Sequence, residues 1–353
     1  MAGTRALRVA VVGAGAFGRN HLRVLRELQQ AGQAVELVAV VDRDSAAAAA
    51  ASEKFSVPGF ETIEACLTAV GGLDAASVCV PTIHHASAAA PLLTAGVDLL
   101  IEKPLAASLA DADLILELAQ KHGRVVQVGH LERFNPAVTA AQQHLHKPMF
   151  FEAHRLSIFT PRSLDVDVVL DLMIHDLDIV LSLVASPVRE VRAVGLPVLS
   201  RKVDIANVRV EFENGCIANF TASRVSTERV RKLRFFQPHQ YLSLDFARQD
   251  LLMIDVTAAA GMDPAMLAAL AEKAQQAGAL PGGHPSAGLS LKKVAVELGE
   301  PLRLEIEAFL KAVRERSRPV VSGEDGRAAL ALALEINEAI AVHAERAGLR
   351  DFM

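Results

Sequence analysis

Short apolar runs alternate with segments of helical periodicity over the first 130 residues of the chain. Apolar runs bounded by turn residues are typical of buried strands, and apolar positions three or four apart are typical of amphipathic helices. This alternation predicts βαβ units and a parallel sheet. The predicted strands are 7–12, 35–41, 75–80, 97–101 and 124–128, and the predicted helices lie near 16–31, 44–54, 61–69, 84–95 and 108–121.

The pattern changes after about residue 147, where apolar runs follow one another with few helices between them. Such a succession indicates a mostly antiparallel sheet. One predicted helix, about 166–184, interrupts it, two more close the chain near 301–316 and 323–347, and 257–290 permits no firm assignment. The predicted strands are 150–157, 191–199, 208–212, 217–222, 232–236 and 241–246.

The first predicted strand runs directly into a turn with the spacing G-x-G-x-x-G, between residues 13 and 18. In a dinucleotide-binding turn, the first glycine permits the bend, the second lets a pyrophosphate approach the backbone, and the third lets the helix pack on the strand. The helical spacing of Leu22, Leu25 and Leu28 supplies the context that the motif requires. The expected cofactor contacts here are Gly13, Gly15, Ala16, Phe17 and Gly18.

These patterns predict two domains, because 353 residues exceed what one hydrophobic core usually holds. Residues 1–128 are expected to form an α/β Rossmann domain that binds a dinucleotide. Residues 129–353 are expected to form an α+β domain with a large, mostly antiparallel sheet, for substrate binding and oligomerisation. We also consider that the closing helices pack back towards the first domain.

Asp42 ends the second predicted strand, 24 positions after Gly18, close to where a dinucleotide fold places its ribose-binding acid. A carboxylate there accepts hydrogen bonds from the 2′-hydroxyl and repels a 2′-phosphate, which favours NAD over NADP, although Arg43 would partly offset the repulsion. The alternative is that Asp42 is only a turn residue at the strand end. Further expected cofactor contacts are Arg43, Pro81, His84, Glu102 and Lys103.

Composition excludes several classes of function. The net charge of −5 shows no basic excess, so neither nucleic acid nor a membrane is an expected partner, and a small molecule is. Cys66, Cys79 and Cys216 form no C-x-x-C pair, which argues against a disulfide framework and a zinc knuckle and fits a reducing cytoplasm. The uncharged stretch between Asp74 and Asp98 is long enough for a membrane span, but its prolines, histidines and glycine favour strand, loop and helix.

Three stretches offer chemistry where the two domains are expected to meet. Glu102, Lys103 and Pro104 follow a predicted parallel strand, at the edge where open α/β sheets bind ligands. A lysine there can donate to a reacting oxygen or relay its proton, although a surface turn would also explain these residues. His130 and Arg133 lie in the crossover between the domains, where a cofactor and a substrate would be held together, but a lone histidine is often structural.

Asn135 and Pro136 are explained without any function, as the N-cap and first residue of a helix.

Asp171 and His175 are four residues apart in the helix predicted within the second domain, so they share a face that Asp178 extends. The carboxylate can orient the imidazole, and a histidine that titrates near neutrality is suited to general-base catalysis. A solvated helix face with an ion pair is the alternative. No metal is expected, because two ligands at this spacing have no third in view.

The order and spacing of these motifs resemble the Gfo/Idh/MocA oxidoreductase family over nearly the whole chain. The resemblance rests on the glycine turn, on Glu102-Lys103-Pro104, on Asp171-x-x-x-His175 and on the closing helix opened by Ser322-Gly323-Glu324-Asp325-Gly326. It implies NAD-dependent oxidation of a hydroxyl on a sugar or cyclitol. It also implies that Lys103 and His175 are catalytic with Asp171 as the accompanying acid, and that the broad sheet makes contacts in a homo-oligomer, a dimer or a tetramer.

Residues 130–136 resemble, more narrowly, the nucleotide-sugar oxidases, particularly UDP-N-acetylglucosamine 3-dehydrogenases that precede an aminotransferase in making a 3-amino sugar. A cluster of five cations could hold the diphosphate of such a substrate, or could form a solvated strand edge or a subunit contact. The cluster consists of Arg224, Arg229, Arg231, Lys232 and Arg234. The expected substrate contacts are His130, Arg133, Asn135, Arg155 and His175.

Three other functions remain open. They are a dehydrogenase of a free sugar or inositol, a non-catalytic sensor that binds NAD and a sugar, and a glycoside hydrolase that uses NAD for transient oxidation. Fold alone does not separate them. Intact Lys103, Asp171 and His175 favour an enzyme, because a sensor has no need of a base.

Overall fold

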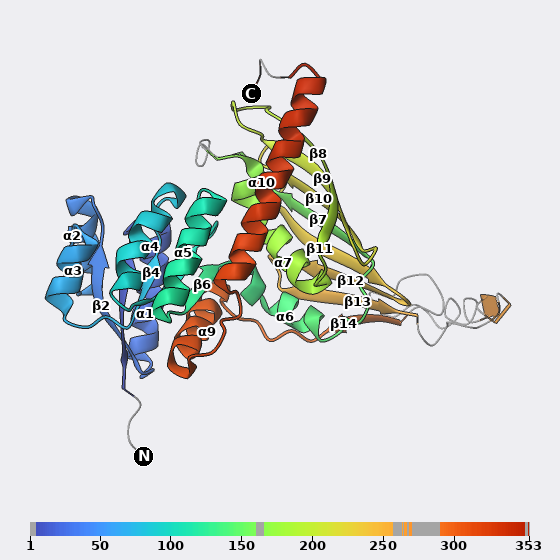
Figure 1. Cartoon of the computed structure of the whole chain (residues 1–353). Helices are drawn as coiled ribbons and strands as arrows, with labels where there is room; N and C mark the ends of the chain where they lie inside the picture. Colours follow the sequence, from blue (N-terminus) through green and yellow to red (C-terminus); the bar gives the residue numbers. More distant parts are fainter. Residues whose placement is uncertain are drawn as a thin grey trace. The chain divides into compact units, whose positions relative to one another are not determined.

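The computed structural model describes residues 5–159, 166–256, 263, 265–266, 268–269, 290–349 and 352. The chain divides into two compact units. The first unit comprises Met1–Phe134 and Gly299–Leu332, and the second comprises Asn135–Leu298 and Ala333–Met353. Figure 1 labels the helices and strands of both. Helix α10 (Gly323–Arg346) contributes its beginning to the first unit and the remainder to the second.

The first unit is built on a six-stranded parallel sheet in the order β3-β2-β1-β4-β5-β6. This is the strand order of a Rossmann fold, and it confirms the predicted α/β class. The short strand β3 was not predicted, because two residues carry no periodicity. The strands are β1 (Leu7–Val12), β2 (Val35–Val41), β3 (Gly59–Phe60), β4 (Ala75–Val78), β5 (Asp98–Glu102) and β6 (Val126–Gly129).

The helices of the first unit begin and end close to the predicted residues. Their bounds follow local signals, as in α2, where the Asp44 carboxylate accepts hydrogen bonds from the backbone N–H groups of Ala46 and Ala47 and caps the alanine tract. The helices are α1 (Ala16–Gln30), α2 (Ser45–Phe55), α3 (Ile63–Val70), α4 (His85–Thr94), α5 (Leu109–His122) and α9 (Pro301–Glu315), with 3-10 turns η1 (Thr82–His84) and η2 (Leu131–Phe134).

The first unit is larger than the predicted segment 1–128, because residues from the end of the chain complete its core. Leu25 of α1 and Phe309 of α9 belong to one buried apolar cluster with strand residues such as Val9. At the sheet edge, the Val128 N–H donates to the Val321 carbonyl at 3.0 Å. Helix α9 therefore covers α1 and the sheet as an integral helix of this unit.

The second unit contains an eight-stranded sheet in the order β14-β13-β12-β11-β7-β10-β9-β8. Its neighbours are antiparallel except for β7 and β10, which confirms the predicted mostly antiparallel class. Residues 257–290, for which the sequence permits no firm assignment, lie almost entirely outside the described residues. The strands are β7 (Phe150–Leu156), β8 (Val188–Leu196), β9 (Ile205–Phe212), β10 (Ile217–Ser223), β11 (Val230–Gln237), β12 (Gln240–Asp245), β13 (Asp250–Asp255) and β14 (Ser290–Val294).

The two faces of this sheet differ in burial. Phe151 and Phe235 are fully buried on one face, and the next residues along their strands, such as Phe150 and Phe236, are half-buried on the other. Figure 1 shows α6 (Pro136–Gln142), α7 (Ile174–Val184) and the later part of α10 against one face. In the described part of the chain, no helix combines the length and apolarity needed to cross a membrane.

Candidate functional site

A cavity of about 650 Å³ opens at the carboxyl ends of β1, β2 and β4 in the first unit. The strand order reverses at β1, which lies between β2 and β4, and open α/β sheets bind their ligands at such a switch point. Residues from the ends of all three strands line the cavity, together with the start of α3 and of α4. The lining includes Gly13, Gly15, Asp42, Arg43, Glu61, Thr62, Cys79, Pro81 and His84.

The glycine turn has the geometry that a dinucleotide requires. Gly13 has a φ of +102°, and a Cβ there would lie 2.6 Å from the Cys79 carbonyl oxygen. A Cβ at Gly18 would lie 1.8 Å from the Gly13 carbonyl oxygen, so α1 packs on the strand only with glycine at this position. A Cβ at Gly15 would meet nothing within 4 Å, which leaves open space beside the N-terminus of α1. This space and the helix N–H groups fit a pyrophosphate.

Asp42 lines this cavity and also braces the turn. Its Oδ2 accepts a 2.7 Å hydrogen bond from the Ala14 N–H, and its Oδ1 accepts a 2.9 Å hydrogen bond from the Asp44 N–H. Asp42 therefore stabilises the turn, as a turn residue would, and it also lines the cavity. The Arg43 guanidinium lies 3.2 Å from His84 Nε2, so the loop after β2 and the residue before α4 meet in the lining of the cavity.

The charges of the cavity favour a ribose without a 2′-phosphate. Asp42, Glu61 and Glu64 contribute three carboxylates to the lining, whereas Arg43 is its one Arg or Lys among the described residues. A dianionic 2′-phosphate would add like charge to this environment. The structure therefore fits NAD.

His85 was not singled out from the sequence, yet it ties two parts of the site together. Its Nδ1 lies 2.9 Å from the Pro104 carbonyl oxygen, and its Nε2 lies 3.0 Å from the Val80 carbonyl oxygen. Burial lowers the pKa of His85, so the ring is neutral and donates to one of these carbonyls at a time. It thereby connects the end of β4 to the turn after Lys103, whose peptide bond to Pro104 is cis.

Glu102 is buried and meets His21, another residue not predicted for the site. The Glu102 Oε1 lies 2.9 Å from His21 Nε2, which donates its hydrogen to the carboxylate. Gly129 leaves room for this carboxylate, since a Cβ at that position would lie 2.9 Å from Glu102 Oε1. The sequence signal for His21 was its place on the buried face of α1 beside Leu22 and Leu25.

His130 and Arg133, predicted as substrate contacts, both belong to the first unit. His130 is fully buried, and burial together with the charges of Lys103 and Arg133 lowers the pKa of His130 to about 3. It is therefore a neutral imidazole at physiological pH. Arg133 is half-buried and donates a 3.1 Å hydrogen bond to the Val320 carbonyl.

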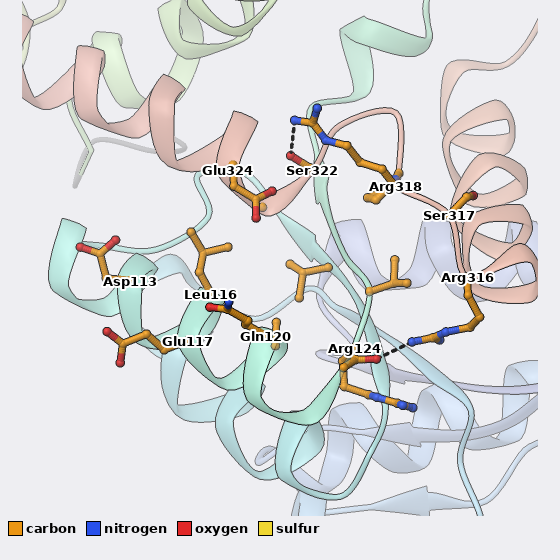
Figure 2. Close-up of a pocket in the computed structure, with 16 residues that line it drawn as sticks. Asp113, Leu116, Glu117, Gln120, Arg124, Arg316, Ser317, Arg318, Ser322 and Glu324 are labelled. Carbon is orange, nitrogen blue, oxygen red and sulfur yellow. Dashed lines mark hydrogen bonds between the residues drawn. The ribbon is translucent and has the colours of Figure 1, made fainter.

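A second cavity of the first unit, of about 810 Å³, does not fit the cofactor (Figure 2). It lies beside Val125 and Val126, at the amino end of β6, whereas dinucleotides bind at carboxyl ends. Its arginines already have partners: the Arg316 guanidinium donates to the Gly123 carbonyl, Arg124 donates to the Gly96 carbonyl, and Arg318 donates to Ser322, as Figure 2 shows for the last pair. Arg316 also contacts Asp98.

In the second unit, Asp171 and His175 lie on the predicted helix, but its first turn is not α-helical. Val169–Met173 form a π-helical turn that contains Asp171, and α7 begins at Ile174. Such turns inside helices occur frequently at functional sites. Both side chains are half-buried. The alternative of a solvated polar stripe is wrong for Asp178, which is 2% exposed.

Arg155, predicted as a substrate contact, is 4% exposed and makes a two-point contact with Asp176 of α7. Arg155 Nε donates to Asp176 Oδ2 and Nη2 donates to Oδ1, both at 2.8 Å. The guanidinium also lies over the Phe246 ring, 5.3 Å from its centroid. We therefore assign Arg155 to fastening α7 on the sheet.

Asn135 is likewise explained by structure, as the N-cap of α6. Its Oδ1 accepts from the Ala137 N–H at 3.1 Å and its Nδ2 donates to the Phe246 carbonyl at 3.0 Å. The cation cluster also does not act as one surface, because Arg224 is 5% exposed and its Nε donates to Asp204 at 2.7 Å. These contacts give Asn135 and Arg224 a structural role.

The parallel sheet, the glycine turn and the cavity at the switch point define a dinucleotide-binding protein of the Rossmann class. Comparison with protein families agrees with this class. Residues 7–130 match the oxidoreductase family described as an NAD-binding Rossmann fold, and residues 137–237 match the Gfo/Idh/MocA C-terminal domain. The chain belongs to the Gfo/Idh/MocA family of NAD-binding oxidoreductases.

Individual relatives agree with the family. A UDP-N-acetylglucosamine 3-dehydrogenase of Acidithiobacillus ferrooxidans is 33% identical over 96% of this chain and 99% of its own length. Its solved structure has a TM-score of 0.82 at 32% identity and covers 96% of this chain and 98% of that chain. An inositol 2-dehydrogenase of Acidothermus cellulolyticus is 30% identical over 55% of this chain and 58% of its own length. A levoglucosan dehydrogenase solved with NADH shares the fold, with a TM-score of 0.79 at 17% identity over 96% of this chain and 97% of that one.

Proposed function

We propose that this chain oxidises a ring hydroxyl of a nucleotide sugar to a ketone, with NAD as the hydride acceptor. The proposed substrate is UDP-N-acetylglucosamine, oxidised at its 3-hydroxyl ahead of transamination to a 3-amino sugar. The observation that carries the proposal is the extent of similarity to the Acidithiobacillus enzyme, which spans both units at 96% of this chain. The similarity to the inositol dehydrogenase covers only 55% of the chain.

The proposed chemistry assigns one task to each of three residues. When bound, NAD⁺ accepts the hydride from the sugar carbon. His175 takes the hydroxyl proton, Asp171 orients the imidazole, and Lys103 donates a hydrogen bond to the reacting oxygen. These roles rest on the family resemblance and on the Asp171–His175 spacing. The π-helical turn that contains Asp171 supports them, because such turns occur often at functional sites.

The cofactor contacts are proposed from the cavity of the first unit. The backbone at Gly13, Gly15, Ala16, Phe17 and Gly18 would hold the pyrophosphate, as the space beside Gly15 supports. Asp42 would accept the ribose hydroxyls. Arg43, Pro81 and His84 would surround the adenosine, and Glu102 and Lys103 would lie towards the nicotinamide. Arg133 remains the proposed substrate ligand of the first unit.

The test is turnover of purified protein with NAD⁺ and a panel of substrates, followed by NADH absorbance. We expect reduction with UDP-N-acetylglucosamine and none with N-acetylglucosamine or UDP alone. Borodeuteride reduction of the product, followed by mass spectrometry, locates the new carbonyl at C3. Turnover with myo-inositol but with no UDP-sugar would contradict the substrate and favour the inositol dehydrogenases. Binding of sugar and NAD⁺ without turnover would favour the sensor.

We also propose that the half-buried face of the large sheet makes contacts between copies of the chain. Three aromatic rings lie side by side on it, with Phe150 and Phe236 centroids 5.5 Å apart and Phe236 and Tyr241 centroids 4.9 Å apart. Contiguous half-exposed aromatic side chains favour association. Light scattering at micromolar concentration should give a dimer or a tetramer, and a clean monomer would refute this proposal.

A further inference from the structure

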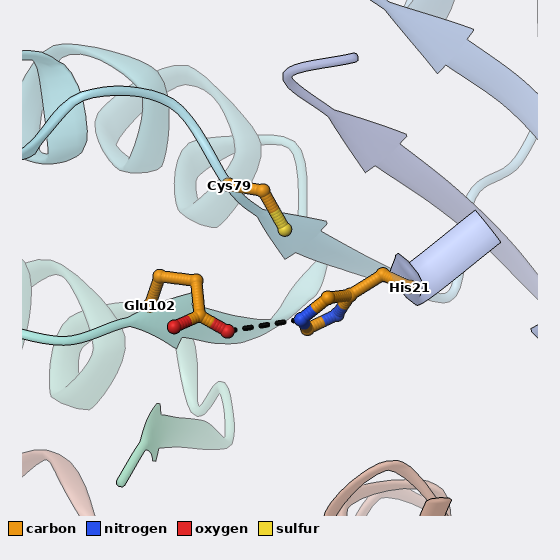
Figure 3. A group of neighbouring side chains, drawn as sticks. All are labelled: His21, Cys79 and Glu102. Carbon is orange, nitrogen blue, oxygen red and sulfur yellow. Dashed lines mark hydrogen bonds and ion pairs between the residues drawn. The ribbon is translucent and has the colours of Figure 1, made fainter. Parts of the chain in front are cut away.

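Three side chains with metal-binding atoms meet beneath the cofactor turn of the first unit (Figure 3). His21 comes from α1, Cys79 follows β4 and Glu102 ends β5. One ligand atom from each lies within 4.8 Å of the other two. Among the residues that the structure describes, no other group of three or more His, Cys, Asp and Glu side chains meets this criterion. In Figure 3 the thiol and the carboxylate both point towards the imidazole ring.

The fold brings these residues together through two local devices. Val78 and Ile101 are paired across β4 and β5, so Cys79 and Glu102, the next residues, lie side by side at the carboxyl edge of the sheet. Helix α1 approaches that edge because Gly18 has no side chain: a Cβ there would lie 1.8 Å from the Gly13 carbonyl oxygen, and Cys79 is in van der Waals range of the same position, at 3.5 Å. This close approach places His21, one turn further along α1, against both strands.

The donor set is one that zinc favours. Imidazole nitrogen, thiolate sulfur and carboxylate oxygen are the three common zinc ligands in proteins. In a tetrahedral site their atoms are roughly 3.3–3.8 Å apart, given metal–ligand distances of about 2.0–2.3 Å. The present separations reach at most 4.8 Å and include 2.9 Å between His21 Nε2 and Glu102 Oε1. Small side-chain rotations would therefore complete three positions of a tetrahedron.

The electrostatic environment also favours a cation. Burial raises the pKa of the Cys79 thiol, and the negative charges of Glu102 and Glu305 raise it further. Without a cation the thiol is therefore protonated, and the two carboxylates create a negative potential in a buried place. A bound divalent cation would reverse the effect on the thiol, because a coordinated thiol is deprotonated.

We propose that His21, Cys79 and Glu102 form a zinc site whose occupancy competes with NAD. On binding, the Cys79 thiol releases one proton to solvent, and the Nε2 hydrogen of His21 moves to Nδ1, so that sulfur, nitrogen and carboxylate oxygen each present a lone pair to the metal. The His21 Nδ1 atom is buried and has no hydrogen-bond partner among the described residues, so it is free to take the hydrogen. The new tautomer gives up the Nε2–H hydrogen bond to Glu102, and coordination of both atoms to the metal replaces that contact. Competition follows because Cys79 also lines the cofactor cavity. None of the three proposed metal ligands is a proposed contact of the sugar substrate.

The test is titration of the purified protein with Co²⁺, which reports a thiolate ligand through a sulfur-to-cobalt charge-transfer absorption. We expect one equivalent to bind with this absorption in the wild type, and Zn²⁺ to displace it. Cys79→Ala should abolish the absorption. Cys66→Ala and Cys216→Ala are controls that should retain it, because these two thiols lie outside the group of three ligands. They are suitable controls since burial raises the pKa of each thiol, to about 11. Absence of the band in the wild type, or its persistence in Cys79→Ala, would overturn the site.

Two further measurements keep the proposal testable if Cys79→Ala does not fold. His21→Ala retains the thiol and should weaken Co²⁺ binding roughly tenfold or more. Adding NAD⁺ to the wild type should raise the apparent dissociation constant for Co²⁺, and an unchanged constant at saturating NAD⁺ would overturn the competition. None of these readouts depends on a sugar substrate, so failure of the proposed dehydrogenase reaction and failure of the zinc site are distinguishable.

Discussion

The Asp42 carboxylate accepts a 2.7 Å hydrogen bond from the Ala14 backbone N–H, which links the end of β2 to the glycine turn after β1. Its other oxygen accepts from the Asp44 N–H, just before α2. Each carboxylate oxygen has more than one lone pair, so both keep acceptor capacity for ribose hydroxyls. The same carboxylate therefore shapes the turn and presents negative charge to the cavity.

The first prediction concerns cofactor choice. Wild-type protein should bind NAD(H) more tightly than NADP(H), and Asp42→Ala should narrow the difference, because the carboxylate that repels a 2′-phosphate is removed. Fluorescence titration with both cofactors measures the ratio. Asp44→Ala is the matched control, since Asp44 only caps α2, and it should cost about 1 kcal/mol of stability and leave the ratio unchanged. Equal affinities in the wild type would contradict the assignment.

The glycine turn permits a test that separates binding from folding. The Cβ that Gly15→Ala adds would meet no atom within 4 Å, so the substitution should change the free energy of unfolding by less than about 1 kcal/mol. Because this Cβ would occupy the space proposed for the pyrophosphate, NAD⁺ binding should weaken roughly tenfold or more. Gly13→Ala should instead destabilise the fold by about 2–5 kcal/mol, because of its positive φ and its contact with the Cys79 carbonyl. Urea unfolding and cofactor titration of both variants check this. Unchanged NAD⁺ affinity in Gly15→Ala would remove the pyrophosphate from this position.

Local patterns predicted most of the fold because each element carries its own periodicity and caps. The Asp44 cap and the helix start at Pro136 needed only neighbouring residues. The contribution of α9 to the first unit could not be predicted, because it depends on packing against α1, which is far away in the sequence. The parallel pairing of β7 with β10 is equally non-local.

The residues of the candidate site also fall into those predicted from local motifs and those that depend on contacts between distant parts of the sequence. The glycine turn and Asp42 are short motifs whose spacing has a physical meaning, so the sequence was sufficient to predict them. His21 and Glu102 meet only because the strand order brings their elements together, so their contact has no sequence signature. In contrast, the presence of several cations close together in the sequence does not show which of their side chains are buried. Arg224 was wrongly grouped with exposed neighbours because its partner, Asp204, is twenty residues away in the sequence.

Acid should destabilise the protein through His130. The folded-state pKa is lowered to about 3, chiefly by burial, whereas an unfolded histidine titrates near 6.5. The unfolded state therefore binds more protons between these values, and stability falls as pH falls through that window. Between pH 7 and pH 5 the loss from this residue should be about 2 kcal/mol. Urea unfolding at the two pH values measures it.

His130→Asn is the variant for this test and should reduce the loss of stability between pH 7 and pH 5. His146 offers a control, because it is exposed on the surface and His146→Asn should retain the full loss. If the wild type and His130→Asn lose the same stability on acidification, His130 is not buried as a neutral imidazole.

The last prediction concerns the base. His175 and Lys103 can both take the hydroxyl proton, but an imidazole starts near pKa 6.5, close to neutrality, whereas an ammonium near 10.4 must be depressed by several units before it accepts one. We therefore expect His175→Ala to reduce kcat by roughly 10²–10⁴ and to retain NAD⁺ binding. Lys103→Met should also lose most turnover, because the reacting oxygen loses its donor.

The pH profile separates the two roles. With His175 as base, kcat/KM falls on the acidic side as the imidazole is protonated, and this limb should vanish in His175→Ala while it persists in Lys103→Met. His175→Gln supports the reading if it is as impaired as His175→Ala, since an amide can occupy the position of the ring but cannot accept the proton. Turnover of His175→Ala within about threefold of wild type is far short of the loss expected for a general base, and Lys103 would then be the base.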